Sequence, residues 1–155
     1  MDWLLDLVTN PFLLTALSSW FVAQVAKTII NAIINKKLSW ERMVGDGGMP
    51  SGHSATVSSL ATIAGLVYGF GSFQFGMAAI LAIIVCHDAT GVRHEAGKHA
   101  VLLNEMRRFF ESLESNELPE MKLKEFVGHT VFQVTAGIAI GIGNALLLYF
   151  FFFRF

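Results

Sequence analysis

The charged residues of this chain are clustered, and between the clusters lie apolar tracts long enough to cross a lipid bilayer. Only 15% of the residues are charged, whereas a soluble domain usually carries about a quarter. Hydrophobic residues make up 54% of the 155 residues. We therefore predict an all-α integral membrane protein, and its length suits a single membrane-embedded domain over residues 1–155.

Four transmembrane helices are predicted from these tracts, at residues 11–34, 50–70, 73–87 and 128–153. Asn10 can cap the first of them, with Pro11 just inside its start. Residues 1–10 are predicted to form a short interfacial segment. Gly65 and Gly69 lie four positions apart, which allows close helix packing. With the glycines of the last tract, they favour a homodimer.

Residues 91–114 show a different pattern, in which apolar side chains recur every three or four positions and charged side chains occupy the other faces. We predict a cytoplasmic amphipathic helix that lies on the membrane or on the spans. Pro119 lies in the segment that ends this helix, and residues 121–126 are predicted as a short second piece.

The basic residues predict the orientation of the protein in the membrane. Of the 11 lysines and arginines, nine lie in the loop after the first span or between the third and fourth spans. The positive-inside rule makes that side cytoplasmic, with both termini outside, and the plasma membrane is the expected location. The same cytoplasmic face then carries the ends of four helices and the polar residues Arg42, His53, Asp88, Arg93 and His129.

The stretch GDGGMPSGHSAT, residues 45–56, combines glycines, a proline and small hydroxyl residues before a helix. We expect Pro50 at an early helical position and Ser51 or Met49 at the boundary, so that backbone N–H groups point at an anion. His53 in the first turn can give a proton near neutral pH. The alternative is a glycine-rich loop that opens an ordinary helix.

Lys27 is an ionisable residue inside the first span, on a stripe with Gln24 and Asn31. Such a residue is costly in a membrane and usually faces the protein interior or a water-filled cavity. The alternative is that Lys27 extends its ammonium group toward the nearby polar end of the span. Cys86 stands alone in an apolar run, which excludes a disulfide framework and a cysteine-based metal site.

The motif PSGH at residues 50–53 is the second signature of the type 2 phosphatidic acid phosphatase superfamily, which includes lipid phosphatases, bacterial acid phosphatases and vanadium haloperoxidases. Together with HDATGVRHEAGKHAVLLNE and LKEFVGHTVFQVTAGIAIGI, it makes the chain resemble the small divergent membrane branch of that superfamily. The resemblance covers residues 24–142. It implies phosphate chemistry on a membrane-embedded lipid or isoprenoid substrate, with no nucleic-acid partner.

Two superfamily signatures depart from their usual form in this chain. The first, a lysine followed by Arg-Pro, is absent, and Lys27 and Arg42 are the available substitutes. In the third, an arginine precedes a histidine nucleophile that is followed by an acidic residue. Arg93 with His99 has the right spacing but lacks the acid, whereas His129 with Gln133 matches the tail of the signature. We prefer the second alignment.

The resemblance implies hydrolysis of a phosphomonoester or pyrophosphate through a phosphohistidine. His129 would attack phosphorus, and His53 would protonate the leaving oxygen and then activate water. The equatorial oxygens would be held by cationic side chains and by N–H groups at the helix start, from Lys27, Arg42, Ser51, Gly52 and Arg93. This mechanism needs no metal or cofactor, although Asp88 and Glu125 at the same face leave room for a divalent ion. Asp88 can also cap a helix or pair with Arg93.

Gln133 stands where the superfamily has a carboxylate that orients the nucleophilic histidine. Its carbonyl can accept the same hydrogen bond but brings no negative charge. Glu125 and Asp88 are candidates for compensation. The alternative function is a catalytically degenerate protein that binds a phosphorylated headgroup or a partner, and a third reading is vanadate-dependent oxidation in the same pocket.

Overall fold

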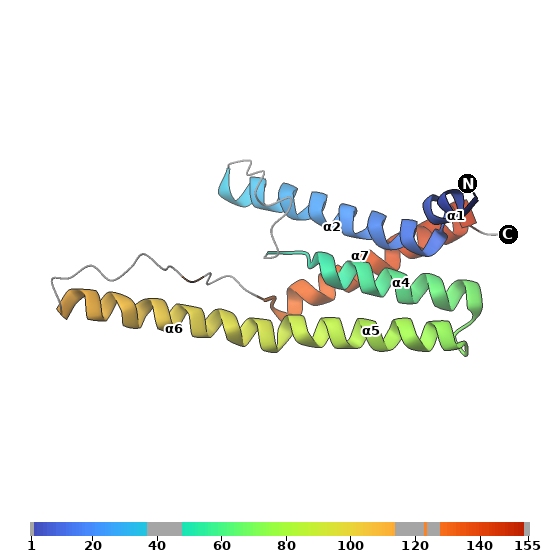
Figure 1. Cartoon of the computed structure of the whole chain (residues 1–155). Helices are drawn as coiled ribbons and strands as arrows, with labels where there is room; N and C mark the ends of the chain where they lie inside the picture. Colours follow the sequence, from blue (N-terminus) through green and yellow to red (C-terminus); the bar gives the residue numbers. More distant parts are fainter. Residues whose placement is uncertain (1, 37–47, 114–122, 124–127, 154–155) are drawn as a thin grey trace.

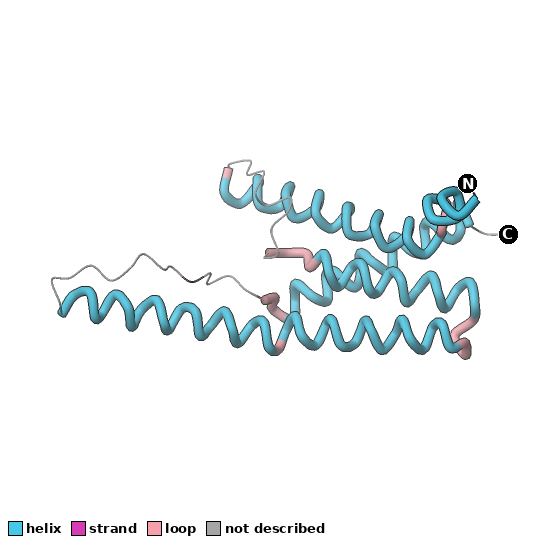
Figure 2. Tube along the Cα trace, viewed as in Figure 1, coloured by secondary structure: helices cyan, strands magenta, loops and turns pink. Residues whose placement is uncertain are grey.

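The computed structural model describes residues 2–36, 48–113, 123 and 128–153, and all regular structure in these residues is helical (Figure 2). This confirms the prediction of an all-α membrane bundle. The elements are α1 (Asp2–Val8), α2 (Pro11–Asn35), α4 (Gly52–Tyr68), α5 (Phe73–Thr90), α6 (Val92–Leu113), α7 (Val131–Leu148) and a π-helical turn, η1 (Tyr149–Phe153).

Three helical stretches among the described residues are long and apolar enough to cross a membrane: α2, the run from α5 into α6, and α7 with η1. The remaining predicted span, at residues 50–70, corresponds to α4, which has 17 residues, or about 25 Å of helix. It packs against α2, α5 and α7 and lies between them (Figure 1). Helix α4, which is the most polar of these four helices, is therefore covered by the other three.

Small residues fill the centre of the bundle, and large apolar side chains face outward. Ala23, Ala55 and Ala145 are fully buried, whereas Phe21, Ile83 and Phe132 are more than half exposed. Helices in lipid gain nothing from hiding large apolar side chains and associate through close contact of small ones. Buried polar contacts add to this, because the Asn144 amide donates to the hydroxyls of Ser18 and Ser19 at 2.9 and 2.8 Å.

The crossing of α7 over α4 depends on two glycines. A Cβ on Gly137 would overlap the carbonyl oxygen of Ser51, and one on Gly141 would overlap the Ala55 carbonyl oxygen and the Ser58 hydroxyl. These contacts bring the start of α7 against the start of α4. The backbone N–H of Ser51 donates to the carbonyl oxygen of Gln133 at 3.0 Å across this crossing.

Two predictions about the second span are wrong. Pro50 lies before the helix rather than in its first turn, because Ser51 has extended φ and ψ angles and caps α4. Gly69 makes no close helix contact. It ends α4 instead, with a φ of +87° that favours glycine. Gly65 does lie in a tight contact, with the rings of Phe70 and Phe75.

Helix α6 has nearly the predicted bounds but does not lie on the spans. It continues the direction of α5 and extends beyond the other helices (Figure 1). The Gly91 N–H donates to the His87 carbonyl oxygen at 2.8 Å, and the Glu95 N–H donates to the Gly91 carbonyl oxygen at 3.0 Å. Helical hydrogen bonding therefore carries through the junction. The second short piece predicted at residues 121–126 lies outside the described residues, apart from Leu123.

Both chain termini lie at one end of the bundle (Figure 1). The other end holds the C-terminal ends of α2 and α5 and the N-terminal ends of α4 and α7. The sequence predicted that these four helix ends would converge. The starts of α4 and α7 and the end of α5 lie together, whereas α2 extends past the start of α4 (Figure 1). The candidate functional residues come from this end.

Candidate functional site

The N-terminus of α4 presents backbone donors at the convergent end of the bundle. Ser51 is fully buried, and its hydroxyl accepts from the Ser54 N–H at 3.3 Å, which makes it the predicted cap. The N–H groups of Gly52 and His53 have no hydrogen-bond partner within the described part of the chain. Gly52 is buried and the His53 side chain is exposed. These donors and the helix dipole favour an anion here.

One face of α2 forms a wall beside these donors. Trp20, Gln24 and Lys27 lie at i, i+4 and i+7 and so share this face. A Cβ on Gly52 would stand 3.3 Å from the Trp20 ring and 3.8 Å from Cδ of Gln24. The alkyl chain of Lys27 lies 3.7 Å from the corresponding point on Gly48. Lys27 is 3% exposed, so of the two alternatives that the sequence left open, it faces the protein interior.

The segment before α7 holds His129 against the end of α5. The backbone N–H of His129 donates to the Ala89 carbonyl oxygen at 2.9 Å, and its side chain is 4% exposed. Gly128 precedes it with a φ of +91°, and a Cβ there would overlap the backbone of Arg93 and His94. Only glycine therefore allows this segment to approach the start of α6 so closely.

Gln133 caps α7 in this structure. Its side-chain oxygen accepts from the backbone N–H of Thr130 at 3.0 Å, and the Thr130 hydroxyl accepts from the backbone N–H of Gln133 at 3.3 Å. This reciprocal pair is a capping box, which glutamate supports as well as glutamine. The oxygen that was expected to orient His129 is therefore used to satisfy a backbone donor.

Asp88 and Arg93 form an ion pair at the junction of α5 and α6. Nε of Arg93 lies 2.7 Å from Oδ2 of Asp88, and both side chains are more than a third exposed. The pairing that the sequence analysis left open is therefore present. Because solvent screens it, the pair contributes little to stability.

Two predicted site residues, Arg42 and Glu125, lie outside the described residues. The described residues contain no group of three or more histidine, cysteine, aspartate and glutamate side chains that could hold a metal ion. Of the remaining predicted residues, Lys27, Ser51, Gly52, His53, Asp88, Arg93, His129 and Gln133 all come from helix ends or faces at the convergent end.

Trp20 and Gln24 were not predicted as site residues. The available signal was their helical spacing from Lys27, since the polar stripe of the first span already included Gln24. The spacing did not show which residues of α2 lie beside the first residue of α4. The structure brings Gly52 alongside Gln24 rather than alongside the end of α2.

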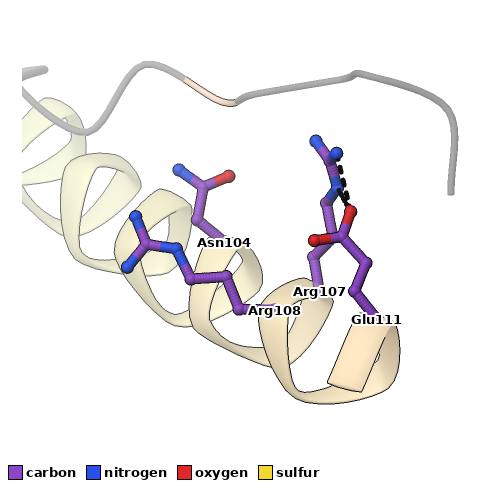
Figure 3. Close-up of a pocket in the computed structure, with 4 residues that line it drawn as sticks. All are labelled: Asn104, Arg107, Arg108 and Glu111. Carbon is purple, nitrogen blue, oxygen red and sulfur yellow. Dashed lines mark hydrogen bonds and ion pairs between the residues drawn. The ribbon is translucent and has the colours of Figure 1, made fainter. Parts of the chain in front are cut away.

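A separate cavity of about 160 Å³ lies along α6, lined by Asn104, Arg107, Arg108 and Glu111 (Figure 3). Arg107 pairs with Glu111 at 2.7 Å, and the Asn104 amide bonds the backbone of Leu123. Asn104 follows Arg93 by 11 residues, or about 17 Å along the helix. This cavity is therefore not part of the site at the convergent end.

A family model described as the Divergent PAP2 family matches residues 8–144 of the chain. The chain belongs to the Divergent PAP2 family. The match spans all the residues of the candidate site, from the α2 wall to the start of α7. It agrees with the resemblance derived from the PSGH motif and the two downstream stretches.

The chain is also similar to a curated bacterial protein, the uncharacterized membrane protein YuiD of Bacillus subtilis (strain 168). The two are 39% identical over 157 residues, covering 96% of this chain and 99% of YuiD. No solved structure matches the chain. This Divergent PAP2 family member is therefore a membrane protein, with helices able to span a bilayer.

Proposed function

We propose that this Divergent PAP2 family protein is a membrane phosphatase that hydrolyses a lipid or prenyl phosphate or pyrophosphate. One observation carries the proposal. The start of α4 bonds the start of α7 through Ser51 and Gln133, and the segment before α7 bonds the end of α5 through His129 and Ala89. The histidine-bearing segments that the superfamily resemblance assigns to catalysis therefore share one end of the bundle with buried Lys27.

In the proposed reaction, a ring nitrogen of His129 attacks phosphorus, a P–N bond forms and the P–O bond to the leaving group breaks. His53 donates the proton that the leaving oxygen takes up, and then removes a proton from the water that attacks the phosphohistidine. This second step breaks the P–N bond and releases phosphate. The Gly52 and His53 N–H groups, with Lys27, Arg42 and Arg93, would stabilise the charge on the phosphoryl oxygens.

The depth of the site favours a lipid substrate. Helix α2 has 25 residues, or about 37 Å, which exceeds a hydrocarbon core of about 30 Å. Gln24 lies 11 residues before its end, so the start of α4 is about 16 Å below that end. A phosphate at this depth suits a substrate whose chains remain in the bilayer.

The proposal includes a plasma-membrane location with the site on the cytoplasmic face, a homodimer and no required cofactor.

Phosphate release by the purified protein tests the proposal, with phosphatidic acid, phosphatidylglycerol phosphate and prenyl pyrophosphates as substrates. We expect one class to be hydrolysed, His129→Ala to abolish release and His53→Ala to slow it at least about 100-fold. His99→Ala is the matched control, because His99 is exposed on α6. Release that proceeds equally in His129→Ala would reject the mechanism.

A second function, binding of a phosphorylated headgroup without turnover, is favoured by the state of Gln133. Its side chain carries no charge, and its oxygen caps α7. Gln133→Glu keeps the capping box and adds a negative charge near His129. Hydrolysis that is present in Gln133→Glu but absent in the wild type, with phosphate bound by both, would identify the natural protein as a binding protein.

A further inference from the structure

Gln24 is a buried amide with an unused acceptor. The residue is 6% exposed, and its Oε1 atom has no hydrogen-bond partner among the residues that the structure describes. An unsatisfied buried polar group is destabilising, and native proteins hold few of them. In a transmembrane helix, such a group marks a place where a ligand or a water molecule can supply the missing donor.

The Gln24 amide lies beside the first residue of α4, which carries donors of the candidate phosphate site. Its Cδ atom lies 3.8 Å from the position that a Cβ on Gly52 would take, at the first residue of α4. The N–H groups of Gly52 and His53 have no partner in the described part of the chain. Trp20 covers one side of this point, and Lys27 lies about one turn along α2.

The chemistry of this arrangement restricts the ligand. Backbone N–H groups and a lysine ammonium can only donate hydrogen bonds, whereas Oε1 of Gln24 can only accept one. A ligand that satisfies both needs bare anionic oxygens and an O–H group on the same centre. The second pKa of inorganic phosphate and of its monoesters is about 6 or above, so a fraction of these molecules still carries an O–H group near neutral pH. Sulfate and phosphodiesters carry no such proton.

We infer that Gln24 is a phosphate-binding residue whose carbonyl oxygen accepts a hydrogen bond from a protonated phosphate oxygen. The residue thereby selects monoesters and terminal phosphates over diesters and sulfate. The inference rests on the phosphate site of the proposed function but does not require turnover. It also explains why α2 carries an unsatisfied amide beside a helix N-terminus.

Binding of inorganic phosphate and of sulfate, measured by calorimetry at neutral pH on the purified protein, tests the inference. Gln24→Met removes the acceptor at nearly constant volume and is expected to weaken phosphate binding about tenfold or more, with sulfate binding unchanged. Gln24→Leu is measured beside it, so that the result does not depend on one variant. The matched control is Gln74→Met, at an exposed glutamine of α5.

The thermal unfolding of the ligand-free protein separates a binding role from a structural one. Removal of an unsatisfied buried group does not lower the unfolding temperature, whereas loss of a structural hydrogen bond does. An unchanged ratio of phosphate to sulfate affinity in both variants would overturn the inference, as would a wild type that binds neither anion. If phosphate binding depends on Gln24 but no lipid phosphate is hydrolysed, the inference stands and the phosphatase proposal fails.

Discussion

Lys27 is the residue whose surroundings most restrict what this end of the bundle can do. It is 3% exposed in a helix long and apolar enough to span a membrane, and it lies beside Gly48 in the approach to α4. A charge in this position is costly, so proteins keep it where it meets a substrate, an ion path or an opposite charge. Its place beside the α4 N-terminus fits a phosphate ligand.

Replacement of Lys27 by methionine should weaken binding of inorganic phosphate about tenfold or more, because a hydrogen bond to a charged group contributes about 1.5–3 kcal/mol. Calorimetry on the purified protein measures this change. Lys36→Met is the control, since Lys36 is an exposed lysine at the end of the same helix. Equal phosphate affinity in the wild type and in Lys27→Met would show that Lys27 is not a phosphate ligand.

At the scale of the elements, two glycines decide where α7 meets α4. Gly137 and Gly141 are one turn apart on α7 and face Ser51, Ala55 and Ser58 without room for a Cβ. The hydrogen bond from Ser51 to Gln133 lies next to this contact. The position of the α7 start relative to the α4 start is therefore fixed by this close helix contact.

Gly137→Ala should destabilise the protein by about 1–3 kcal/mol, because the added methyl group forces α7 away from α4. Gly143→Ala is the control, since a Cβ there meets nothing within 4 Å. That control should be as stable as the wild type or gain up to about 1 kcal/mol from helix propensity. Chemical unfolding in detergent measures both variants. Equal stabilities would mean that the α4–α7 contact tolerates a larger spacing.

The helices could be predicted from the sequence, but the contacts between them could not. The apolar tracts gave the bounds of α2 to within a residue, and the alternation of apolar and charged residues gave those of α6. The position of Gly52 beside Gln24 depends on packing between segments that are distant in the sequence, so no local sequence pattern predicts it. The motif around Pro50 likewise predicted a helix start, with Ser51 or Met49 at its boundary. The extended backbone of Ser51 shows that Ser51 is the cap.

On the scale of the whole molecule, both termini lie at one end of the bundle and the candidate site at the other (Figure 1). Lys36 and Arg93 lie at the site end, whereas the turn at Gly71 and Ser72 joins α4 to α5 at the end with the termini. By the positive-inside rule, the excess of basic residues at the site end predicts that this end is cytoplasmic. A lipid substrate would then enter from the inner leaflet.

Cysteine labelling tests this orientation. With Cys86 replaced by serine, a cysteine at Lys36 should react with an impermeant reagent only after the membrane is opened. A cysteine at Gly71 should react in intact cells, because both positions are exposed and lie at opposite ends. The reverse pattern would place the site outside and remove the argument for an inner-leaflet substrate.

The most direct test of the account is to look for the phosphoryl group on His129. The protein is mixed with a prenyl pyrophosphate or phosphatidic acid labelled in its terminal phosphate, quenched under alkaline conditions that preserve phosphohistidine, and digested for peptide mapping. The account predicts label on the peptide that contains His129, and none in His129→Ala. Phosphate release without labelled His129, or label that persists in His129→Ala, would contradict it.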